Sequence, residues 1–509
     1  MPLTDFTAKI KEYCTGSDLL SGVSCIVTGL SGGPDSVALI CSLAEMRDDA
    51  NGFPKIMAVH VNHGLRPSAG EDEALAEHLC GKLGVEFVSY HFDVREEASK
   101  MGRGLEETGR ILRYKAFNEV ADQKALSLGV DRSSIKIATA HHKGDLTETF
   151  LMNLFRGSGL DGLTAMSSDK ALIRPLICVT KDEILSYLES LNEPYAVDET
   201  NEHNDFTRNK WRNEIIPSIS EVSVKDPAEA VLDTYGLLRQ DADYLTKVSE
   251  DSYRSCVITK GKYRFLKAQD VSGLDPAIRS RVIRLYWKDL FGNLTDFETK
   301  HLDIVTELIA NESGTKYADL PFGRKAVVVN GLLGFYGDEG PCGLSCAMAT
   351  YLGFPAGVMD GYVLIRAGEL QSGPKTVKLS DSGVFIEVSV VENSDSIVYN
   401  NLSWIGACDE LVIGACPSEG IFRKAGSSCP SDLKKIMSDM KVPRDARGHL
   451  IAVSSGDRIL FIPGIGHSEG FISPKSREIW NKEKGHSDIM TLMKVTVSEK
   501  EQVWTSSRL

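Results

Sequence analysis

Three polar side chains and two glycines in the segment Ser31-Gly32-Gly33-Pro34-Asp35-Ser36 have the types and spacing of a phosphate-binding loop. The segment follows an apolar run and precedes a second one with the length of a buried helix, which predicts a strand-to-helix turn. There the first N–H groups of the helix have no partner, and glycines let an anion approach the backbone. Ser31 and Ser36 can donate to phosphate oxygens, whereas Asp35 suits Mg²⁺ or another cation beside the phosphates. We expect a nucleotide site here; the alternative is an ordinary Gly/Pro/Ser loop.

Two acidic residues, Asp145 and Glu148, lie three positions apart where a helix is expected to begin, after a buried strand over 135–140. Carboxylates at this spacing share one helix face and can hold Mg²⁺ or orient a nucleophile. The alternative is the ordinary enrichment of acids in the first helical turn. His141 and His142 precede the pair, but adjacent residues rarely chelate one ion, so we do not expect zinc. The metal ligands stay unassigned.

Polar residues also follow a second predicted buried strand, over 56–61. His60, Asn62 and His63 stand at its carboxyl end. Because the ligand crevice of an open α/β sheet lies outside the carboxyl ends of its strands, we expect them near the phosphate loop. For each residue the alternative is a loop side chain that caps or meets solvent.

Two pairs of arginines share helix faces by their spacing. Arg110 and Arg113 lie on a predicted helix, where such residues ordinarily serve solubility. Arg208 and Arg212 interleave with Phe206 and Trp211, a pattern that suits phosphate contacts and base stacking. An ordinary amphipathic helix start would look similar.

The overall charge is acidic, with a formal net charge of −14, which argues against a generally basic nucleic-acid coat. A local basic groove can still bind RNA. The densest basic group of the second half surrounds Lys434 and Lys435 on a short amphipathic helix, where we expect RNA phosphate contacts.

The elements that position these residues predict an α/β fold. Over roughly the first 215 residues short apolar runs alternate with helical patterns, which indicates a parallel sheet covered on both faces. We expect three domains: an α/β domain over 1–217 that carries the phosphate loop, a mainly helical domain over 218–340 and a strand-rich α+β domain over 341–509. A chain of 509 residues is too long to fold around a single hydrophobic core.

No apolar run is long enough to cross a bilayer, and the first residues lack a signal-peptide pattern, so we expect a cytoplasmic protein without a membrane partner. Eleven cysteines without a C-x-x-C pair suit reduced thiols.

The loop lacks the Gly-Lys-Ser/Thr of a Walker motif and resembles the PP-loop of the N-type ATP pyrophosphatases. Several further segments occur in the order seen in tRNA(Ile)-lysidine synthetases, and the resemblance spans nearly the whole chain. They are His60–Arg66, Gly109–Tyr114, His141–Thr149, Arg156–Leu160, Arg174–Leu176, Arg208-Asn209, Leu433–Lys435, Val442-Pro443 and Ile462–Gly466.

The resemblance implies a two-step reaction. ATP adenylates the oxygen on carbon 2 of the wobble cytidine in a CAU-anticodon tRNA(Ile), and the amine of free L-lysine then displaces AMP to give lysidine. The implied cofactors are ATP and Mg²⁺. The oligomeric state stays open, with a homodimer as one alternative.

The resemblance also assigns roles. It places Ser31 to Ser36 on ATP, makes Asp145 and Glu148 its acidic positions, and lets one of Arg110 and Arg113 offset phosphate charge. Arg208 and Arg212 match basic positions near the tRNA or the adenylate.

Three positions depart from the pattern. Many members carry Asp-Asp-Gln where this chain has Gly144-Asp145-Leu146, and His203 stands where an acid is frequent. Two alternatives therefore stay open: another PP-loop tRNA-modifying ligase or thiolase, and a non-catalytic tRNA-binding module.

Overall fold

The computed structural model separates into two compact units, Met1–Tyr244 and Leu245–Leu509. The structure describes residues 3–50, 52–64, 69–166, 171–196, 206–310, 314–357, 361–366, 369, 374–378, 384–391, 402–405, 410–417, 419–424, 427, 429–468, 492–499 and 502–503. His203, one of the three departures, lies outside these residues.

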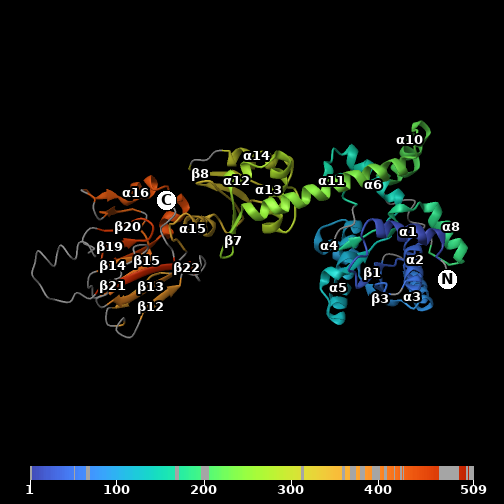
Figure 1. Ribbon diagram of the computed structural model, residues 1–509, viewed down its shortest axis with the longest axis horizontal. Helices are drawn as coiled ribbons and strands as arrows, with labels where there is room; N and C mark the ends of the chain where they lie inside the picture. Colours follow the sequence, from blue (N-terminus) through green and yellow to red (C-terminus); the bar gives the residue numbers. More distant parts are fainter. Residues whose placement is uncertain are drawn as a thin grey trace, which may run out of the picture. The chain divides into compact units, whose positions relative to one another are not determined.

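The first unit is built on a five-stranded parallel sheet with the strand order β3-β2-β1-β4-β5 (Figure 1). Its strands are β1 (Cys25–Gly29), β2 (Lys55–Asn62), β3 (Glu86–His91), β4 (Ile135–Ala138) and β5 (Leu172–Ile173). β1 pairs with β2 on one side and β4 on the other, so the order of the strands reverses direction between β1 and β4. Such a reversal is where open α/β sheets bind ligands.

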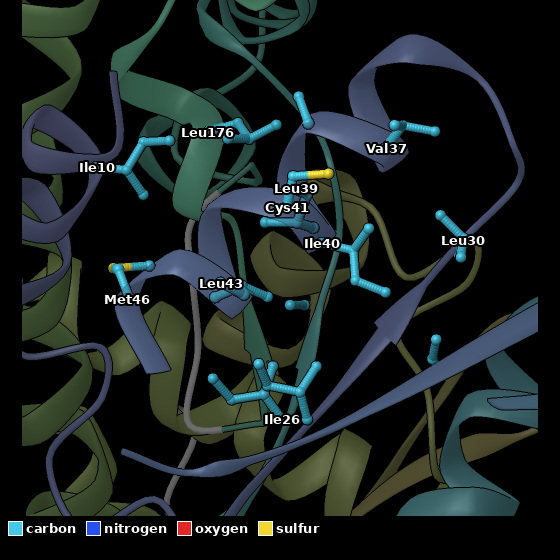
Figure 2. Packing of buried hydrophobic residues seen from close by; sticks show 14 of the residues in the cluster. Ile10, Ile26, Leu30, Val37, Leu39, Ile40, Cys41, Leu43, Met46 and Leu176 are labelled. Atoms are coloured by element: carbon cyan, nitrogen blue, oxygen red, sulfur yellow. The ribbon is translucent and has the colours of Figure 1, made fainter. Parts of the chain in front are cut away.

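Successive residues of a strand point to opposite sides, so the apolar strands of this sheet present side chains on both faces. Helices cover both faces. Ile26 packs on one face, in a core with residues from α1 (Asp5–Gly16), α2 (Pro34–Asp49) and α8 (Lys181–Leu191). Figure 2 shows this core, with Ile10, Leu39, Leu43 and Leu176 as members. Burying one such aliphatic side chain contributes about 1.5–3 kcal/mol to the free energy of folding, relative to leaving it exposed.

The opposite face is covered by α5 (Leu105–Leu128), whose Phe117 and Val120 pack against Val27 of β1. A Cβ on Gly29 would lie 2.5 Å from the Phe117 ring, so only glycine permits this approach. Because α5 follows β3 and returns along the sheet, its first half lies at the carboxyl edge of the strands.

The remaining helical elements of the first unit connect the strands or follow the sheet in the chain. They are α3 (Ala69–Leu83), α4 (Val94–Met101), η1 (Arg132–Ser134), α6 (Lys143–Phe155), α7 (Leu160–Leu163), η2 (Pro175–Cys178), α9 (Phe206–Lys210), the π-helix η4 (Trp211–Ile215) and α10 (Ile216–Val222). α11 (Pro227–Cys256) follows, and its Val231 and Tyr235 pack against α6.

In the second unit, an antiparallel sheet with the order β6-β7-β10-β9-β8 packs against helices around Trp287. The sequence predicts a mainly helical region here, but the structure also contains this five-stranded sheet. The elements are β6 (Val257–Lys260), β7 (Tyr263–Lys267), α12 (Ala268–Ser272), α13 (Pro276–Phe291), α14 (Thr299–Ile309), β8 (Thr315–Asp319), β9 (Lys325–Val329) and β10 (Leu332–Tyr336).

The rest of the second unit is strand-rich, as the sequence predicts. Two antiparallel sheets have the orders β11-β15-β18-β19-β20 and β12-β13-β21-β14, and β22 pairs with β21. The elements are α15 (Cys342–Tyr351), β11 (Val363–Arg366), β12 (Lys375–Lys378), β13 (Val384–Val391), β14 (Leu402–Ile405), β15 (Glu410–Ala415), β16 (Ile421–Phe422), β17 (Ser431–Asp432), α16 (Leu433–Asp439), η6 (Arg444–His449), β18 (Ile451–Ser455), β19 (Arg458–Ile462), β20 (Gly466–His467), β21 (Leu492–Glu499) and β22 (Gln502–Val503).

The ten cysteines in the described part of the chain are all free thiols, and eight of them are buried. Among the described residues, no helix has the length and apolar character that a membrane span requires.

Candidate active site

The predicted phosphate loop is a strand-to-helix turn between β1 and α2. Gly32 has φ +87°, a left-handed conformation that favours glycine, and Gly33 is the N-cap of α2. The Ser36 hydroxyl donates to the Gly33 carbonyl at 2.9 Å, and the Ser31 and Ser36 hydroxyl oxygens are 3.2 Å apart. Because Gly33 has no side chain to cap the helix, the N–H groups of the first turn remain directed at whatever occupies the loop.

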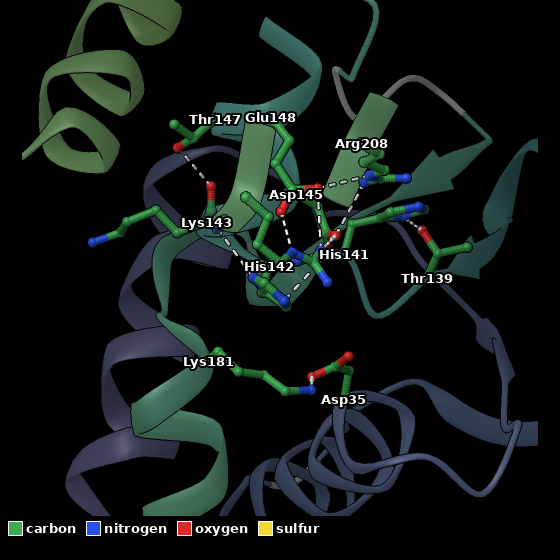
Figure 3. A network of polar contacts seen from close by, with 12 residues as sticks. Asp35, Thr139, His141, His142, Lys143, Asp145, Thr147, Glu148, Lys181 and Arg208 are labelled. Carbon is green, nitrogen blue, oxygen red and sulfur yellow. Dashed lines mark hydrogen bonds and ion pairs between the residues drawn. The ribbon is translucent and has the colours of Figure 1, made fainter. Parts of the chain in front are cut away.

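Asp35, in the first turn of α2, pairs with a lysine that the sequence analysis did not single out. Lys181 is the first residue of α8, and its Nζ lies 2.5 Å from Asp35 Oδ1 (Figure 3). α8 begins with the capping box that its Thr-Lys-Asp-Glu sequence contains, because Thr180 accepts from Glu183 N–H and Glu183 accepts from Thr180 N–H. Lys181 therefore brings a cation to the phosphate loop.

The two acids, Asp145 and Glu148, begin α6 at the carboxyl end of β4. Asp145 Oδ2 accepts the backbone N–H of His142 at 3.0 Å, and His142 Nδ1 accepts the N–H of Gly144 at 3.0 Å, which closes a capping box. Burial alone would raise the pKa of Asp145, but the neighbouring His142, its N–H group and Arg208 lower it below the ordinary value. Asp145 is therefore ionised at neutral pH.

Arg208 and Arg212 close over these acids. Arg208 Nε donates to Glu148 Oε2 at 2.7 Å and its Nη2 donates to Asp145 Oδ1 at 3.1 Å, as Figure 3 shows for Asp145. Arg212 Nη2 donates to Glu148 Oε2 at 3.1 Å. Only 3% of the Glu148 side chain is exposed, so the two arginines compensate a buried charge.

Arg212 interacts electrostatically with the acid pair and with Asp35 of the phosphate loop. Burial alone would lower the pKa of Arg212. Its hydrogen bond to Glu148 and the charges of Glu148, Asp145 and Asp35 outweigh burial, so the pKa lies above its ordinary value. Arg212 therefore lies within electrostatic reach of both Asp35 and the acid pair.

Two of the three departures can be interpreted from their packing. A Cβ on Gly144 would lie 2.8 Å from Cε1 of the His142 ring, so a side chain at 144 requires this ring to move. Leu146 is buried with Phe150, Val231 and Tyr235, and thus belongs to the contact between α6 and α11. Asp145 and Glu148 therefore lie at the site even though residues 144 and 146 depart from the pattern.

His60, Asn62 and His63 end β2 beside the loop, and each has a different environment. His60 is buried and its Nδ1 lies 2.8 Å from the carbonyl oxygen of Leu30, immediately before the phosphate loop. Asn62 donates to Glu73 at 3.3 Å and accepts from Gly64 N–H at 3.0 Å. His60 thus supports the loop from beneath, whereas Asn62 is engaged with α3.

His63 packs on α5, because a Cβ on Gly109 would lie 3.7 Å from its ring. Burial, Arg113 and His60 lower the pKa of His63 to about 4, so its imidazole is neutral at pH 7. Among the described residues, no hydrogen-bond partner reaches His63 Nδ1. Arg113 therefore lies beside this histidine at the sheet edge.

Arg110 lies on the same helix, 5.2 Å from the centre of the Tyr114 ring. It also acts on His141, whose Nδ1 is 2.9 Å from the Thr139 hydroxyl. Burial lowers the pKa of His141 to about 4, with further lowering by Arg174, Arg208 and Arg110 against the opposing charge of Asp145. These couplings bring Arg110 and Arg174 into the neighbourhood of the acid pair.

Lys434 and Lys435 lie in the second unit, at the start of α16. Their N–H groups donate to the N-cap Asp432 at 2.7 and 3.2 Å, and the Lys434 side chain is largely exposed.

In the described part of the chain, no group of three or more His, Cys, Asp and Glu side chains is arranged to hold a metal ion. Mg²⁺ bound to a nucleotide needs only one or two carboxylates besides the phosphates. Asp35 fits that role, because it is in the first turn of the helix that follows the loop.

A family model described as a PP-loop domain matches residues 2–219, and a model of the TilS substrate C-terminal domain matches residues 414–483. The chain is 29% identical to the tRNA(Ile)-lysidine synthase of Caldanaerobacter subterraneus subsp. tengcongensis, over 88% of this chain and 90% of that protein. It is 35% identical to the tRNA(Ile)-lysidine synthase of Clostridium tetani, over 62% of this chain and 64% of that protein.

Among solved structures, the U34-tRNA thiolase NcsA from Methanococcus maripaludis with its [4Fe-4S] cluster is similar to 46% of this chain and 79% of that chain. The identity is 20% and the TM-score 0.38.

Proposed function

We propose that the chain is an ATP-dependent ligase that forms lysidine in tRNA(Ile). The premise is its similarity to the tRNA(Ile)-lysidine synthases, together with its matches to a PP-loop domain and a TilS substrate C-terminal domain. The observation that carries this proposal is the arrangement at one sheet edge: the phosphate loop, Asp35 with Lys181, and the acid pair under Arg208 and Arg212. A site that activates a base with ATP and then accepts an amine needs cationic and anionic groups together.

In the first step, the oxygen on carbon 2 of the wobble cytidine attacks the α-phosphorus of ATP, and pyrophosphate leaves. The N–H groups at the start of α2, with the Ser31 and Ser36 hydroxyls, would hold the phosphates. Negative charge grows on the departing pyrophosphate, and Lys181, with Arg110 or Arg113, is placed to offset it. Mg²⁺ held by Asp35 would neutralise further phosphate charge.

In the second step, the ε-amine of L-lysine attacks carbon 2, and the bond to the oxygen carried away by AMP breaks. Lysine arrives as an ammonium ion, which carboxylates attract. Asp145 and Glu148 are the acids for this task, and Arg208 and Arg212 keep them ionised and oriented. The ammonium must first lose one proton to water so that its nitrogen can attack, and a second proton passes to water after the bond to carbon 2 has formed.

The wider domain roles belong to the same proposal. We assign catalysis to residues 1–217 and tRNA recognition to 218–340 and 341–509, with Lys434 and Lys435 contacting RNA phosphates. Arg208 and Arg212 would meet the RNA at the site itself, while they hold the acids.

The test is transfer of labelled lysine to a CAU-anticodon tRNA(Ile) transcript in the presence of ATP and Mg²⁺, with the matching tRNA(Met) and an Asp35→Ala variant as controls. We expect incorporation only into tRNA(Ile) and only by the unaltered protein. Binding of tRNA without pyrophosphate release would instead identify a non-catalytic module, and sulfur incorporation would identify a thiolase.

A further inference from the structure

Two aromatic rings from separate helices meet beside the acid pair. Phe155 is the last residue of α6 and Trp211 is the first of η4, and their ring centres lie 5.3 Å apart with the planes inclined by 44°. The Phe155 residue is 73% exposed, and its apolar neighbour Leu154 is also exposed. This ring pair is therefore accessible on the surface of the first unit.

The two helices that carry the rings are the ones that build the site. Phe155 follows Glu148 by seven residues, which places both on one side of α6 about 10 Å apart along its axis. Trp211 is the immediate neighbour of Arg212, which binds Glu148. η4 is a π-helical turn, and such turns occur frequently at functional sites.

The surroundings of the ring pair are cationic. Arg156 follows Phe155, while Lys210 and Arg212 flank Trp211, and all three residues are exposed. In a chain with a net charge of −14, this gathers positive charge around an exposed aromatic surface. Cationic side chains bind RNA phosphates, and aromatic rings stack on unpaired bases. The two together are typical of surfaces that bind single-stranded RNA.

We propose that Phe155 and Trp211 form a stacking platform for an unpaired base of the substrate RNA that neighbours the reacting nucleotide. The inference rests on the proposed function, because that function brings an RNA loop to the acid pair. One ring face receives the base, and the adjacent cations receive the backbone phosphates. The platform thereby fixes the position of the reacting nucleotide along α6.

The test measures binding of an anticodon stem-loop RNA to the full chain, with the intact loop and with loops in which one base beside the reacting cytidine is removed. Stacking of one base on an aromatic side chain corresponds to roughly 5- to 150-fold in affinity. We expect that loss when the base is removed, and also when Phe155→Leu or Trp211→Leu is combined with the intact loop. Combining both changes gives little further loss.

Conservative variants separate stacking from folding. Phe155→Tyr keeps a ring and retains the affinity, and Leu126→Ala, at an 83% exposed position of α5, leaves binding unchanged. Unaltered hydrogen exchange of α6 in the Leu variants excludes misfolding. The proposal is overturned if the Leu variants bind the intact loop as the unaltered protein does, or if they lose equal affinity for intact and base-deleted loops.

Lysine transfer, measured with the same variants, distinguishes this proposal from the proposed function. Failure of the unaltered protein to transfer lysine contradicts the function, whatever the binding pattern. Normal transfer with indifference to both rings contradicts only the platform.

Discussion

Replacing Arg208 and Arg212 by methionine, singly and together, tests whether the two arginines act as joint partners of one buried carboxylate. Glu148 is 3% exposed, whereas Arg208 and Arg212 are 37% and 49% exposed. After either single change the remaining arginine still reaches Glu148. We therefore expect each single variant to lower the local stability of α6 by about 1 kcal/mol.

The double variant leaves Glu148 buried without a cation, and removing the partners of a buried charge costs about 3–5 kcal/mol. The loss should thus exceed the sum of the singles by about 1 kcal/mol or more. Adding Glu148→Gln to the double variant removes the buried charge and should restore roughly half of the lost stability.

Native-state hydrogen exchange of peptides from α6 gives the local free energy without assuming that both units unfold together. Arg239→Met is the matched control, because Arg239 pairs with Asp243 on the surface of α11 and its loss should cost under about 0.5 kcal/mol. Additive single effects, or a further loss on adding Glu148→Gln, would refute the reasoning.

Three further predictions concern neighbouring features. Lys181→Met removes the cation beside Asp35, so kcat/KM for ATP in lysine transfer should fall about 10- to 100-fold. Leu146→Gln buries an amide against α11 and should lower the stability of the first unit by about 2–3 kcal/mol in urea unfolding. Lowering the pH from 6.5 to about 4 should destabilise the first unit, because the unfolded chain protonates His63 and His141 there while the folded chain does not; pH-dependent thermal unfolding measures this loss.

Each of these predictions has a control within the first unit. Lys9→Met removes an ion pair with Glu183 on the same helix as Lys181 and should leave kcat/KM unchanged. Leu154→Gln alters an exposed position of α6 and should cost little stability. Replacing both histidines by asparagine should flatten the pH profile below 6.5; an unchanged profile would assign the acid sensitivity to other groups.

The elements of the first unit follow from local signals. The apolar runs before and after Ser31–Ser36 correspond to β1 and α2, and the predicted strands over 56–61 and 135–140 lie within two residues of β2 and β4. These predictions succeed because buried parallel strands are nearly continuous apolar runs. In the second unit β6 and β7 were not predicted, since their alternating, half-polar sequences resemble surface segments.

The site was predictable only in part, because its decisive contacts join distant residues. Glycine, serine and acid spacing indicated the phosphate loop and the acid pair. Lys181 was not predicted as a site residue, because it approaches Asp35 across 146 positions of the sequence. Similarly, nothing in the local pattern distinguishes an RNA-binding Arg212 from one that holds Glu148, since both uses need the same exposed helix position.

The burial of the cysteines has a practical consequence for labelling and oxidation. Burial raises the pKa of the Cys14, Cys41 and Cys80 thiols to about 12, so almost none of the reactive thiolate is present at neutral pH. Cys429, the exposed cysteine among those described, lies in the segment that matches the TilS C-terminal domain. A maleimide dye should therefore modify Cys429 well before these three thiols.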